Sequence, residues 1–406
     1  MTVPPEDLRL PDDVAPRTPA RPGPHEPGAA LVTGASGFLG AALVADLLEH
    51  TTRRVHCLVR PGAEGAAART EGALRSYGLW RPEWADRVVS HAGDLARPGC
   101  GLDPPALRVI ADEVGTVYHC GAGVNVSYPY ETLRGPNVRG TVEVLRLVCS
   151  GRPKRLAHIS TVSVLYGWGT DGEGPAPRTV PDLVELGPTG PPGGYALSKW
   201  AAEQLVVQAR ERGVDARVFR VGTLAGHSVT GVSNPSDYAW LFLRTCAALR
   251  SAPLAATPLQ WAPVDFAARA VTHLTVERDV PGAPPAYHLV APDRIGYTTL
   301  FSWMRRAGHR LRVVDFELWR RDVIEAALTS DREEVRRVGI TLPSAESDGA
   351  VPPDIASDRT DALLAEAGVV CPRLDEPLFR HYLELGARRG ELMPPPLLAG
   401  ATPRAV

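Results

Sequence analysis

Short apolar runs alternate with longer amphipathic stretches over the N-terminal half of the chain. Short runs rich in branched and aromatic residues indicate strands, whereas apolar residues at three- and four-residue intervals indicate helices. Strands are predicted at 30–33, 54–60, 87–95, 116–123 and 155–159, and helical spacing appears at 41–48, at 137–149 and from 195 onwards. This alternation predicts a Rossmann α/β fold, a doubly wound parallel sheet covered by helices on both faces.

The C-terminal half predicts a smaller set of mixed elements. Helices are expected at 235–249, at 265–276, from 297 onwards, at 317–328 and at 376–389, and strands at 286–290 and 311–314. We therefore expect residues 29–225 to form mainly the Rossmann domain. Residues 226–392 are expected to form mainly a mixed α/β substrate-binding lobe, with some segments returning to the first domain.

The two ends of the chain lack this patterning. Residues 1–28 contain eight prolines and almost no apolar periodicity. Such a segment buries too little apolar surface to offset the entropy lost on ordering. We expect a flexible proline-rich arm at 1–28 and a flexible tail at 393–406.

Composition excludes several classes of function. The chain has 406 residues and a net charge of −2 with acidic and basic residues interspersed, which argues against nucleic-acid binding. No apolar run approaches the roughly 20 residues of a membrane helix. The six cysteines stand singly, without the spacing of metal ligands, and indicate free thiols in a reducing compartment. We expect a cytoplasmic, monomeric protein without a metal site.

Three glycines spaced three apart follow the first apolar run. Gly34 permits a tight turn out of the strand, Gly37 lets backbone N–H groups approach a pyrophosphate, and Gly40 lets the next helix pack closely on the sheet. The free N–H groups at the start of that helix would face the anion. The pattern predicts a dinucleotide-binding turn, the alternative being an ordinary glycine-rich loop between a strand and a helix.

Charged residues at the ends of the next two strands bear on the choice of cofactor. Arg60 ends the second strand about twenty residues beyond Gly40, where an acidic residue favours NAD and an arginine accommodates the 2′-phosphate of NADP. Arg69 would add a second charge to that phosphate, and NADPH is therefore expected. Asp94 would reach the adenine amino group. The alternatives are a solvated arginine at position 60 and a turn-forming aspartate at position 94.

Hydroxyl groups and a Tyr/Lys pair point to carbonyl chemistry. Thr161 follows the fifth predicted strand, and Tyr195 and Lys199 lie four residues apart on one face of a predicted helix. A lysine ammonium one turn away favours the phenolate of the tyrosine. If Thr161 converges on the same point, two hydroxyls would address one substrate oxygen while hydride adds to a carbonyl. The alternative is a chance helical pair.

Three motifs resemble those of the extended short-chain dehydrogenase/reductases: Thr33–Gly40, His158–Thr161 and Tyr195–Lys199. More narrowly, the chain looks like the thioester reductase domains that terminate nonribosomal peptide and polyketide synthases, and those of carboxylic acid reductases. The further matching stretches are Cys57–Arg60, Gly93–Leu95, His119–Asn125, Asn137–Thr141, Ser160–Val164, Phe219–Thr223 and Trp261–Asp265. The likeness runs from about Ala29 to about Leu392.

The resemblance implies a set of functional residues. It implies Thr161, Tyr195 and Lys199 as the catalytic set, with Ser163 as a second candidate for the hydroxyl role. The cofactor-binding residues that it implies are Thr33, Gly34, Ser36, Gly37, Phe38, Leu39, Gly40, Arg60, Arg69, Asp94, Leu95, Tyr195, Lys199 and Val221. Val221 and Gly222 stand where many relatives have Pro-Gly, which changes backbone stiffness near the nicotinamide more than the chemistry.

The implied activity is NADPH-dependent reductive release of an acyl or peptidyl thioester from a phosphopantetheine-bearing carrier protein as an aldehyde, with further reduction to the alcohol left open. By analogy, helices 317–328 and 376–389 would cap the substrate cleft and dock the carrier. Four arginines would meet an acidic carrier or a phosphopantetheine phosphate, or are simply solvated: Arg305, Arg306, Arg310 and Arg312. Two other functions remain open, a sugar-nucleotide epimerase or hydroxysteroid-type dehydrogenase on the same fold, and a catalytically silent NADP-binding module.

Overall fold

A seven-stranded parallel sheet dominates the first of two units in this computed structural model, which describes residues 3–16, 28–166, 168, 179–182, 184–254, 258–277, 286–345 and 353–395. The first unit comprises residues 1–222, 264–290 and 352–371, and the second comprises 223–263, 291–351 and 372–406. The chain therefore leaves the first unit three times and returns to it twice.

The strands of the sheet lie in the order β12-β7-β5-β4-β1-β2-β3, and every neighbouring pair is parallel. Their bounds are Ala29–Thr33 (β1), Val55–Val59 (β2), Val88–Ala92 (β3), Val114–His119 (β4), Arg155–Thr161 (β5), Asp215–Val221 (β7) and Ala286–Leu289 (β12). The predicted doubly wound sheet is confirmed. The order turns back between β1 and β4, which is where ligands bind in such folds, outside the carboxyl ends of the strands.

Burial along the strands follows their position in the sheet. Strands β2, β4 and β5 are buried at every residue, whereas β3 at the edge is half-buried to exposed throughout. A parallel sheet covered on both faces requires nearly continuous apolar strands at its centre. This requirement explains why the apolar runs of the sequence were short and unbroken rather than alternating.

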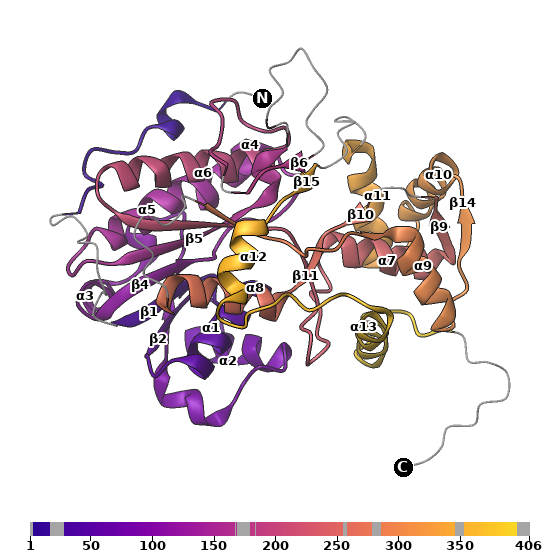
Figure 1. Ribbon diagram of the computed structural model, residues 1–406, viewed down its shortest axis with the longest axis horizontal. Helices are drawn as coiled ribbons and strands as arrows, with labels where there is room; N and C mark the ends of the chain where they lie inside the picture. The colour runs from indigo at the N-terminus through magenta and orange to yellow at the C-terminus, as the bar shows by residue number, and fades with distance from the viewer. Residues whose placement is uncertain are drawn as a thin grey trace. The chain divides into compact units, whose positions relative to one another are not determined.

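Helices cover both faces of the sheet (Figure 1). Helices α1 and α8 pack on one another, and α4 and α5 pack against α6 on the other side. The helices of this unit are Phe38–His50 (α1), Ala66–Ser76 (α2), Pro104–Glu113 (α3), Tyr130–Arg134 (α4), Gly140–Val148 (α5), Gly194–Glu211 (α6), Val264–Thr272 (α8) and Asp358–Ala365 (α12).

Two segments beyond residue 225 belong to the sheet unit. The first of them, residues 264–290, contains helix α8 and strand β12, and β12 pairs with β7. We expected both elements in the C-terminal lobe. Strand β7 itself was not among the predicted strands. Its two buried arginines, Arg217 and Arg220, interrupt the apolar run that would have marked it.

The last part of the first unit is a returning segment, residues 353–371. Strand β15 (Asp354–Ile355) pairs with β6 (Thr179–Val180), and α12 follows it. The backbone N–H of Thr360 donates to Asp182 Oδ2 at 2.8 Å. In Figure 1, α12 is yellow because it comes late in the chain, although its neighbours in this unit come from the middle of the chain.

Residues 3–16 pack on the first unit instead of forming the flexible arm that the proline content predicts. Leu10 and Val14 are 0% exposed and join the apolar core. The guanidinium group of Arg212 donates to three carbonyls of the segment, and Asp7 accepts from Tyr130 Oη at 2.7 Å. A few buried contacts and shared hydrogen bonds thus order a segment that lacks periodicity. Residues 17–27 and most of the expected tail lie outside the described residues.

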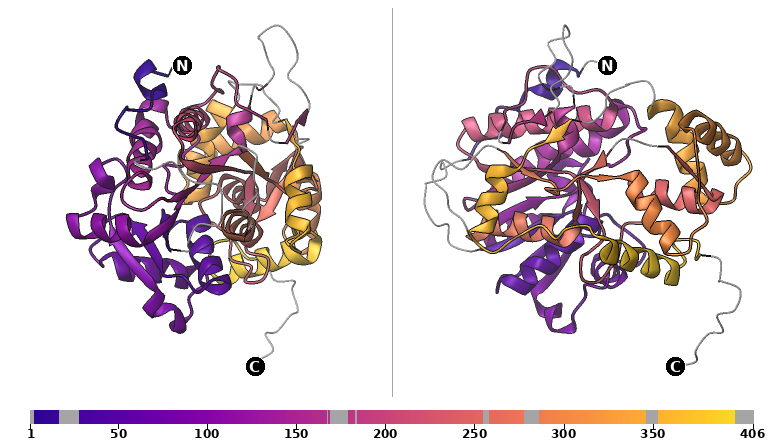
Figure 2. Two further views of the ribbon diagram at one scale, coloured as in Figure 1. Left: turned by 60° about the vertical axis from the view of Figure 1, so that its left-hand side comes forward. Right: turned by 45° about the vertical axis from the view of Figure 1, so that its right-hand side comes forward.

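The second unit has a helical core with short strand pairs (Figure 2). Its helices are Tyr238–Leu249 (α7), Tyr297–Arg306 (α9), Phe316–Ala327 (α10), Glu333–Ala345 (α11) and Glu376–Arg388 (α13). Its strands are Thr223–Ala225 (β8), Ser251–Pro253 (β9), Pro258–Leu259 (β10), Trp261–Pro263 (β11), Ile295–Gly296 (β13) and Arg312–Val314 (β14). Trp240, Phe301 and Trp319 are buried at its centre, so the predicted smaller mixed lobe has its own core.

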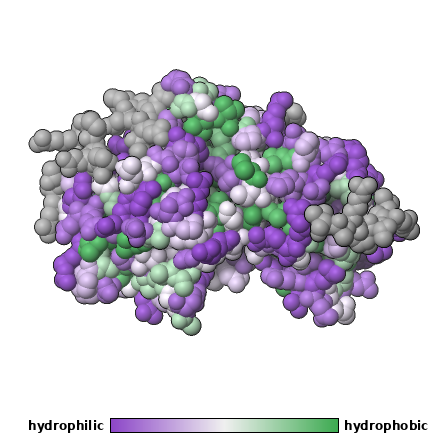
Figure 3. Space-filling model, turned by 90° about the horizontal axis from the view of Figure 1, so that it is seen from below, coloured by the Kyte–Doolittle hydropathy of each residue, from purple (hydrophilic) through white to green (hydrophobic). Residues whose placement is uncertain are grey.

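No helix in the described part of the chain is long and apolar enough to cross a membrane. The face shown in Figure 3 is a mixture of hydrophilic and hydrophobic residues, in which the hydrophobic areas are interrupted rather than joined into a band.

The buried carboxylate of Asp7 gives a test of the packed N-terminal segment. Asp7, 5% exposed, pairs with Arg134, whereas its neighbour Glu6, 68% exposed, pairs with the same arginine. Asp7→Asn removes the buried negative charge that pairs with the Arg134 guanidinium, so it should lower the free energy of unfolding by about 2 kcal/mol. Glu6→Gln should cost less than about 0.5 kcal/mol. Urea unfolding measures both, and equal effects would mean that the segment is not anchored as described.

Candidate functional site

The turn between β1 and α1 has the shape of an anion-binding loop. Gly34 has φ +68°, and a Cβ there would lie 2.6 Å from Gly121 Cα. A Cβ at Gly40 would lie 2.1 Å from the carbonyl oxygen of Gly34. Helix α1 begins at Phe38 without a side-chain cap, so no side chain competes for its first N–H groups. Gly37, exposed beside them, lacks the side chain that would block a pyrophosphate.

Thr33 has an internal role in addition to any role in cofactor binding. Its side chain is fully buried and its Oγ1 lies 2.8 Å from His119 Nδ1. The same oxygen accepts the N–H of Gly121 at 3.0 Å. Thr33 therefore joins the end of β1 to the loop after β4, and its hydroxyl is used within the protein.

The other expected residues around the turn differ in exposure. Ser36 and Phe38 are half-buried and Leu39 is buried, and the Phe38 ring centroid lies 5.4 Å from that of Tyr77. Val221, the last residue of β7, is buried beside Thr161 in the sheet register.

The charged residues expected at the strand ends have different surroundings. Arg60 is exposed and lies in the loop directly after β2. Arg69 on α2 pairs with Glu64 at 3.3 Å. Asp94 Oδ1 accepts the N–H of Ala96 at 3.0 Å, the turn-forming role that was the alternative for this residue. Contacts of these three side chains with a cofactor remain predictions.

Leu95 lies at a point where the backbone is tightly packed. A Cβ on Gly121 would lie 2.7 Å from Leu95 Cδ1, and a Cβ on Gly140 would lie 3.0 Å from Leu95 Cβ. Glycines at these two positions therefore let the loop after β4 and the start of α5 approach the loop after β3.

The structure brings Thr161, Tyr195 and Lys199 together, and we call them the candidate catalytic set. Thr161 ends β5, and its side chain contacts that of Tyr195 in the first turn of α6. Lys199 Nζ donates to the carbonyl oxygen of Ile159, also on β5, at 2.7 Å. The two hydroxyls therefore meet at the carboxyl edge of the sheet with the ammonium group one helical turn away.

Glycines let α6 begin at this place. Gly193, the residue before the helix, has φ +83°. A Cβ on Gly194 would lie 2.3 Å from the carbonyl oxygen of Tyr128, so only glycine allows the helix start to touch the loop before α4. Tyr195 thus takes its position from backbone packing on both sides.

The protonation of Tyr195 differs from the sequence expectation. We expected Lys199 to favour the phenolate, but burial raises the pKa of the Tyr195 phenol to about 12, with Cys120 acting in the same direction and the hydrogen bond from Thr161 opposing. Lys199 instead donates to a carbonyl, and burial lowers its own pKa to about 8. At neutral pH the tyrosine is therefore a neutral hydroxyl, able to donate a proton.

Histidines near Lys199 were missed by the sequence reasoning. His119 and His158 lie on neighbouring strands with ring centroids 5.3 Å apart, and both are buried. Burial lowers the pKa of His119 to about 3 and that of His158 well below its usual value, with the Lys199 charge contributing in both cases. Both are therefore neutral. Each begins one of the stretches that carry the family resemblance, but the sequence analysis gave neither histidine a role of its own.

Asn137 and Ser163 also support the site. Asn137 Nδ2 donates to Ser198 Oγ at 2.8 Å, and Asn137 Oδ1 accepts the N–H of Gly123 at 2.6 Å, which ties the loop after β4 to α6. Ser163 Oγ lies 3.2 Å from Thr161 Oγ1. Ser163 therefore contacts the first hydroxyl candidate.

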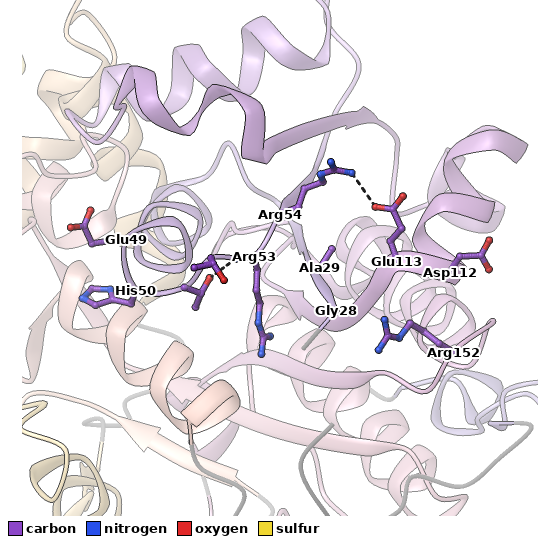
Figure 4. Close-up of a pocket in the computed structure, with 11 residues that line it drawn as sticks. Gly28, Ala29, Glu49, His50, Arg53, Arg54, Asp112, Glu113 and Arg152 are labelled. Carbon is purple, nitrogen blue, oxygen red and sulfur yellow. Dashed lines mark hydrogen bonds and ion pairs between the residues drawn. The ribbon is translucent and has the colours of Figure 1, made fainter. Parts of the chain in front are cut away.

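A shallow depression of about 980 Å³ lies at the opposite edge of the sheet (Figure 4). It is lined by residues at the amino ends of strands and the carboxyl ends of helices, including Glu113, whose carboxylate lies 3.3 Å from Arg54 Nη1. Arginines there complement the negative ends of the helices. Because open α/β folds bind ligands at the carboxyl ends of their strands, this depression is not the candidate site.

Two further sequence expectations are tested in part by the geometry. Among the residues described, no group of three or more His, Cys, Asp or Glu side chains could hold a metal ion. Of the four clustered arginines, Arg306 is paired with Glu376 at 2.7 Å on the neighbouring α13, while Arg305, Arg310 and Arg312 are exposed.

Comparison with known proteins gives consistent matches. The model of an NAD-binding family described as "Male sterility protein" matches residues 32–271. A subunit of the linear gramicidin synthase of Brevibacillus parabrevis is 33% identical over 397 residues, 95% of this chain and 8% of that protein. The isonitrile lipopeptide synthase of Streptomyces coeruleorubidus is 33% identical over 393 residues, 92% of this chain and 26% of the synthase. The chain thus spans only a small part of either relative.

Among solved structures, the terminal R domain from the myxalamid PKS-NRPS biosynthetic pathway is similar with a TM-score of 0.86 and 34% identity. The match covers 96% of this chain and 98% of that domain. These likenesses confirm the resemblance that the motifs indicate and support a nicotinamide cofactor.

The exposed Gly37 gives a test of the turn that does not depend on activity. In Gly37→Ala the new Cβ would lie 3.2 Å from the Gly34 carbonyl oxygen and beside the free N–H groups of α1. Affinity for NADP(H), measured by nicotinamide fluorescence, should fall about tenfold or more because the pyrophosphate loses its approach to the backbone. Gly72→Ala, on α2 with open space around it, is the control and should bind as the wild type does. Unchanged affinity in Gly37→Ala would exclude this turn as the pyrophosphate site.

Proposed function

Because the chain belongs to the NAD-binding male sterility protein family, we propose that it is an NADPH-dependent thioester reductase. It would release an acyl or peptidyl chain from the phosphopantetheine arm of a carrier protein as an aldehyde. The observation that carries this proposal is the meeting of the Thr161 and Tyr195 side chains at the carboxyl edge of the sheet, with Lys199 one helical turn away and bonded to the same strand.

The relatives support this substrate class. Two of them are peptide and lipopeptide synthases, and the similar solved structure is a terminal R domain of a PKS-NRPS pathway. This chain matches one part of each synthase and nearly all of the R domain. The part of such assemblies that this chain resembles over nearly its whole length is thus a terminal R domain, and the motif resemblance implies thioester reduction.

The protonation states suit reduction of a carbonyl. Burial raises the pKa of Tyr195 to about 12, so at neutral pH the phenol carries the proton that it would give to the oxygen of a thioester carbonyl while a hydride adds to the carbon. Thr161 would donate a hydrogen bond to the same oxygen, and the Lys199 charge would stabilise the phenolate left on Tyr195. The resulting hemithioacetal then breaks its carbon–sulfur bond, which yields an aldehyde and the free thiol of the carrier arm.

The group that supplies the hydride fits the residues at the turn. NADPH would deliver the hydride from its nicotinamide when bound. The uncapped start of α1 and the exposed Gly37 would hold its pyrophosphate, and the exposed Arg60 would take the 2′-phosphate. Arg69 is a second candidate for that phosphate.

We assign substrate binding and carrier docking to the second unit. Its helices α10 and α13 are the predicted capping helices, and α10 carries two partly exposed apolar side chains, Phe316 and Leu318. The exposed Arg305, Arg310 and Arg312 would face an acidic carrier or its phosphate.

Removal of the Tyr195 hydroxyl should abolish most of the activity. With NADPH and an acyl pantetheine or CoA thioester, Tyr195→Phe should reduce kcat about 10²- to 10⁴-fold because the proton donor is lost. NADPH oxidation and mass spectrometry of the product measure the loss. Tyr118→Phe is the matched control, since the Tyr118 hydroxyl is buried in β4 and no hydrogen-bond partner for it is described. Turnover of Tyr195→Phe at the wild-type rate would refute the mechanism.

The preference for NADPH should depend on Arg60. Arg60→Ala should raise the Kd for NADPH about tenfold by removing a charge-assisted contact to the 2′-phosphate, with no change for NADH. Arg75→Ala is the control, an exposed arginine of α2 bonded to Glu71. Binding is measured by titration of each variant with each cofactor, and equal losses for NADPH and NADH would assign Arg60 another role.

A further inference from the structure

A buried chain of polar side chains lies directly behind the candidate catalytic set. Glu203 follows Lys199 by one turn of α6, so Tyr195, Lys199 and Glu203 share one face of the helix. Ser160, the residue before Thr161, donates its hydroxyl to Glu203 Oε2 at 2.8 Å. The end of β5 is therefore fastened to α6 twice, once through Ser160 and once through the Lys199 bond to Ile159.

Glu203 also forms a fully buried ion pair. Arg220 of β7 donates its Nε to Glu203 Oε1 at 2.9 Å, and the two side chains are 3% and 2% exposed. Taking both charges out of water costs several kcal/mol, and such pairs seldom stabilise a fold more than apolar residues of similar volume would. A structural role alone explains poorly why Glu203 bonds the residue before Thr161 and lies four residues from Lys199 on the same helix.

The chain of contacts continues to the returning segment. Arg220 Nη1 donates to the carbonyl oxygen of Val184 at 2.7 Å and lies 3.2 Å from His288 Nε2. His288 Nδ1 lies 2.9 Å from the carbonyl oxygen of Ala356. The Arg220 guanidinium and the Glu203 carboxylate thus join five parts of the first unit: β5, β7, β12, α6 and the segment around β15.

We propose that Glu203 is a positioning residue that holds the end of β5 against α6 and thereby sets the contact between Thr161 and Tyr195. The Ser160 hydroxyl links Glu203 to β5. The ion pair with Arg220 fixes the orientation of the Glu203 carboxylate that accepts this hydrogen bond. Each bond of Glu203 is to an element that carries, or directly adjoins, a member of the candidate catalytic set. This inference rests on the proposed function, because the rates that test it are rates of thioester reduction.

The charges around Lys199 support a second effect of Glu203. Cys120 and Glu203 both raise the pKa of the Lys199 ammonium against the effect of burial. Burial raises the pKa of the Cys120 thiol to about 12, and His119 and His158 are neutral. Among these groups Glu203 alone supplies a negative charge at neutral pH.

Lysine NMR tests this effect without any assay of activity. The chain contains two lysines, Lys154 and Lys199, so a protein labelled with ¹³C at lysine Cε gives two resonances. Burial lowers the pKa of both to about 8. In Glu203→Gln the midpoint of Lys199 should fall by about half to one pH unit because a nearby negative charge is lost. Lys154 should keep its midpoint, and Lys154→Arg assigns the two signals.

Rates test the positioning role. Glu203→Gln should lower kcat about 10- to 100-fold, as expected for a small misplacement of catalytic groups, with KM for NADPH within about threefold of wild type. Ser160→Ala keeps the Glu203–Arg220 pair and should lower kcat about 3- to 10-fold. If Glu203→Gln fails to fold, Ser160→Ala carries the test, and a wild-type kcat in that variant would overturn the proposal.

Asp215→Asn is the matched control. Arg155 Nε donates to Asp215 Oδ2 at 2.7 Å, an ion pair that joins β5 to β7 at the ends of these strands remote from the candidate catalytic set. This variant should lose stability but keep the wild-type kcat and the Lys199 midpoint. A Glu203→Gln protein that behaves like Asp215→Asn in all three measurements would show a structural role only and overturn the proposal. If the wild-type protein reduces no thioester, the proposed function fails, and the Lys199 titration still decides whether Glu203 acts on the site.

Discussion

The hydrogen bond from Lys199 Nζ to the carbonyl oxygen of Ile159 is the contact on which the candidate site depends. It fixes α6 at the end of β5, so the hydroxyls of Thr161 and Tyr195 meet although 34 positions separate them in the numbering. The close approach of Gly194 to the loop before α4 holds the helix from the other side. Small residues and one ammonium group thus determine where the candidate catalytic set comes together.

Low polarity around the site sets the protonation of its groups. Burial holds Tyr195 in its neutral form, keeps His119 and His158 uncharged, and brings Lys199 to a pKa of about 8. The proposed reduction needs a neutral acid rather than a phenolate to protonate the developing alkoxide, so desolvation of Tyr195 would favour that reaction. In the same buried surroundings a single negative charge acts strongly on its neighbours, and Glu203 raises the pKa of Lys199 against the effect of burial.

Several features of the fold and the site could be predicted from the sequence because they depend on local spacing. The glycines of the first turn predicted its tight geometry, and the four-residue interval placed Tyr195 and Lys199 on one helical face. Other features depended on distant partners. Strand β7 was missed because its arginines are satisfied by groups far along the chain, such as Glu203 and a carbonyl of residue 274. The order of residues 3–16 was missed because it comes from contacts with Arg212 and Tyr130.

By itself the sequence determined the alternation of strands and helices, the tight glycine turn after the first strand, and the residue types of the candidate catalytic set, because period and motif are properties of neighbouring residues. Only the tertiary structure decided that Tyr195 is a neutral acid, since desolvation depends on what surrounds the phenol rather than on Lys199 one turn away. It alone decided that Ser160, Glu203 and Arg220 form one buried network. A buried charge requires its partner in space, and the order of residues along the chain does not specify that partner.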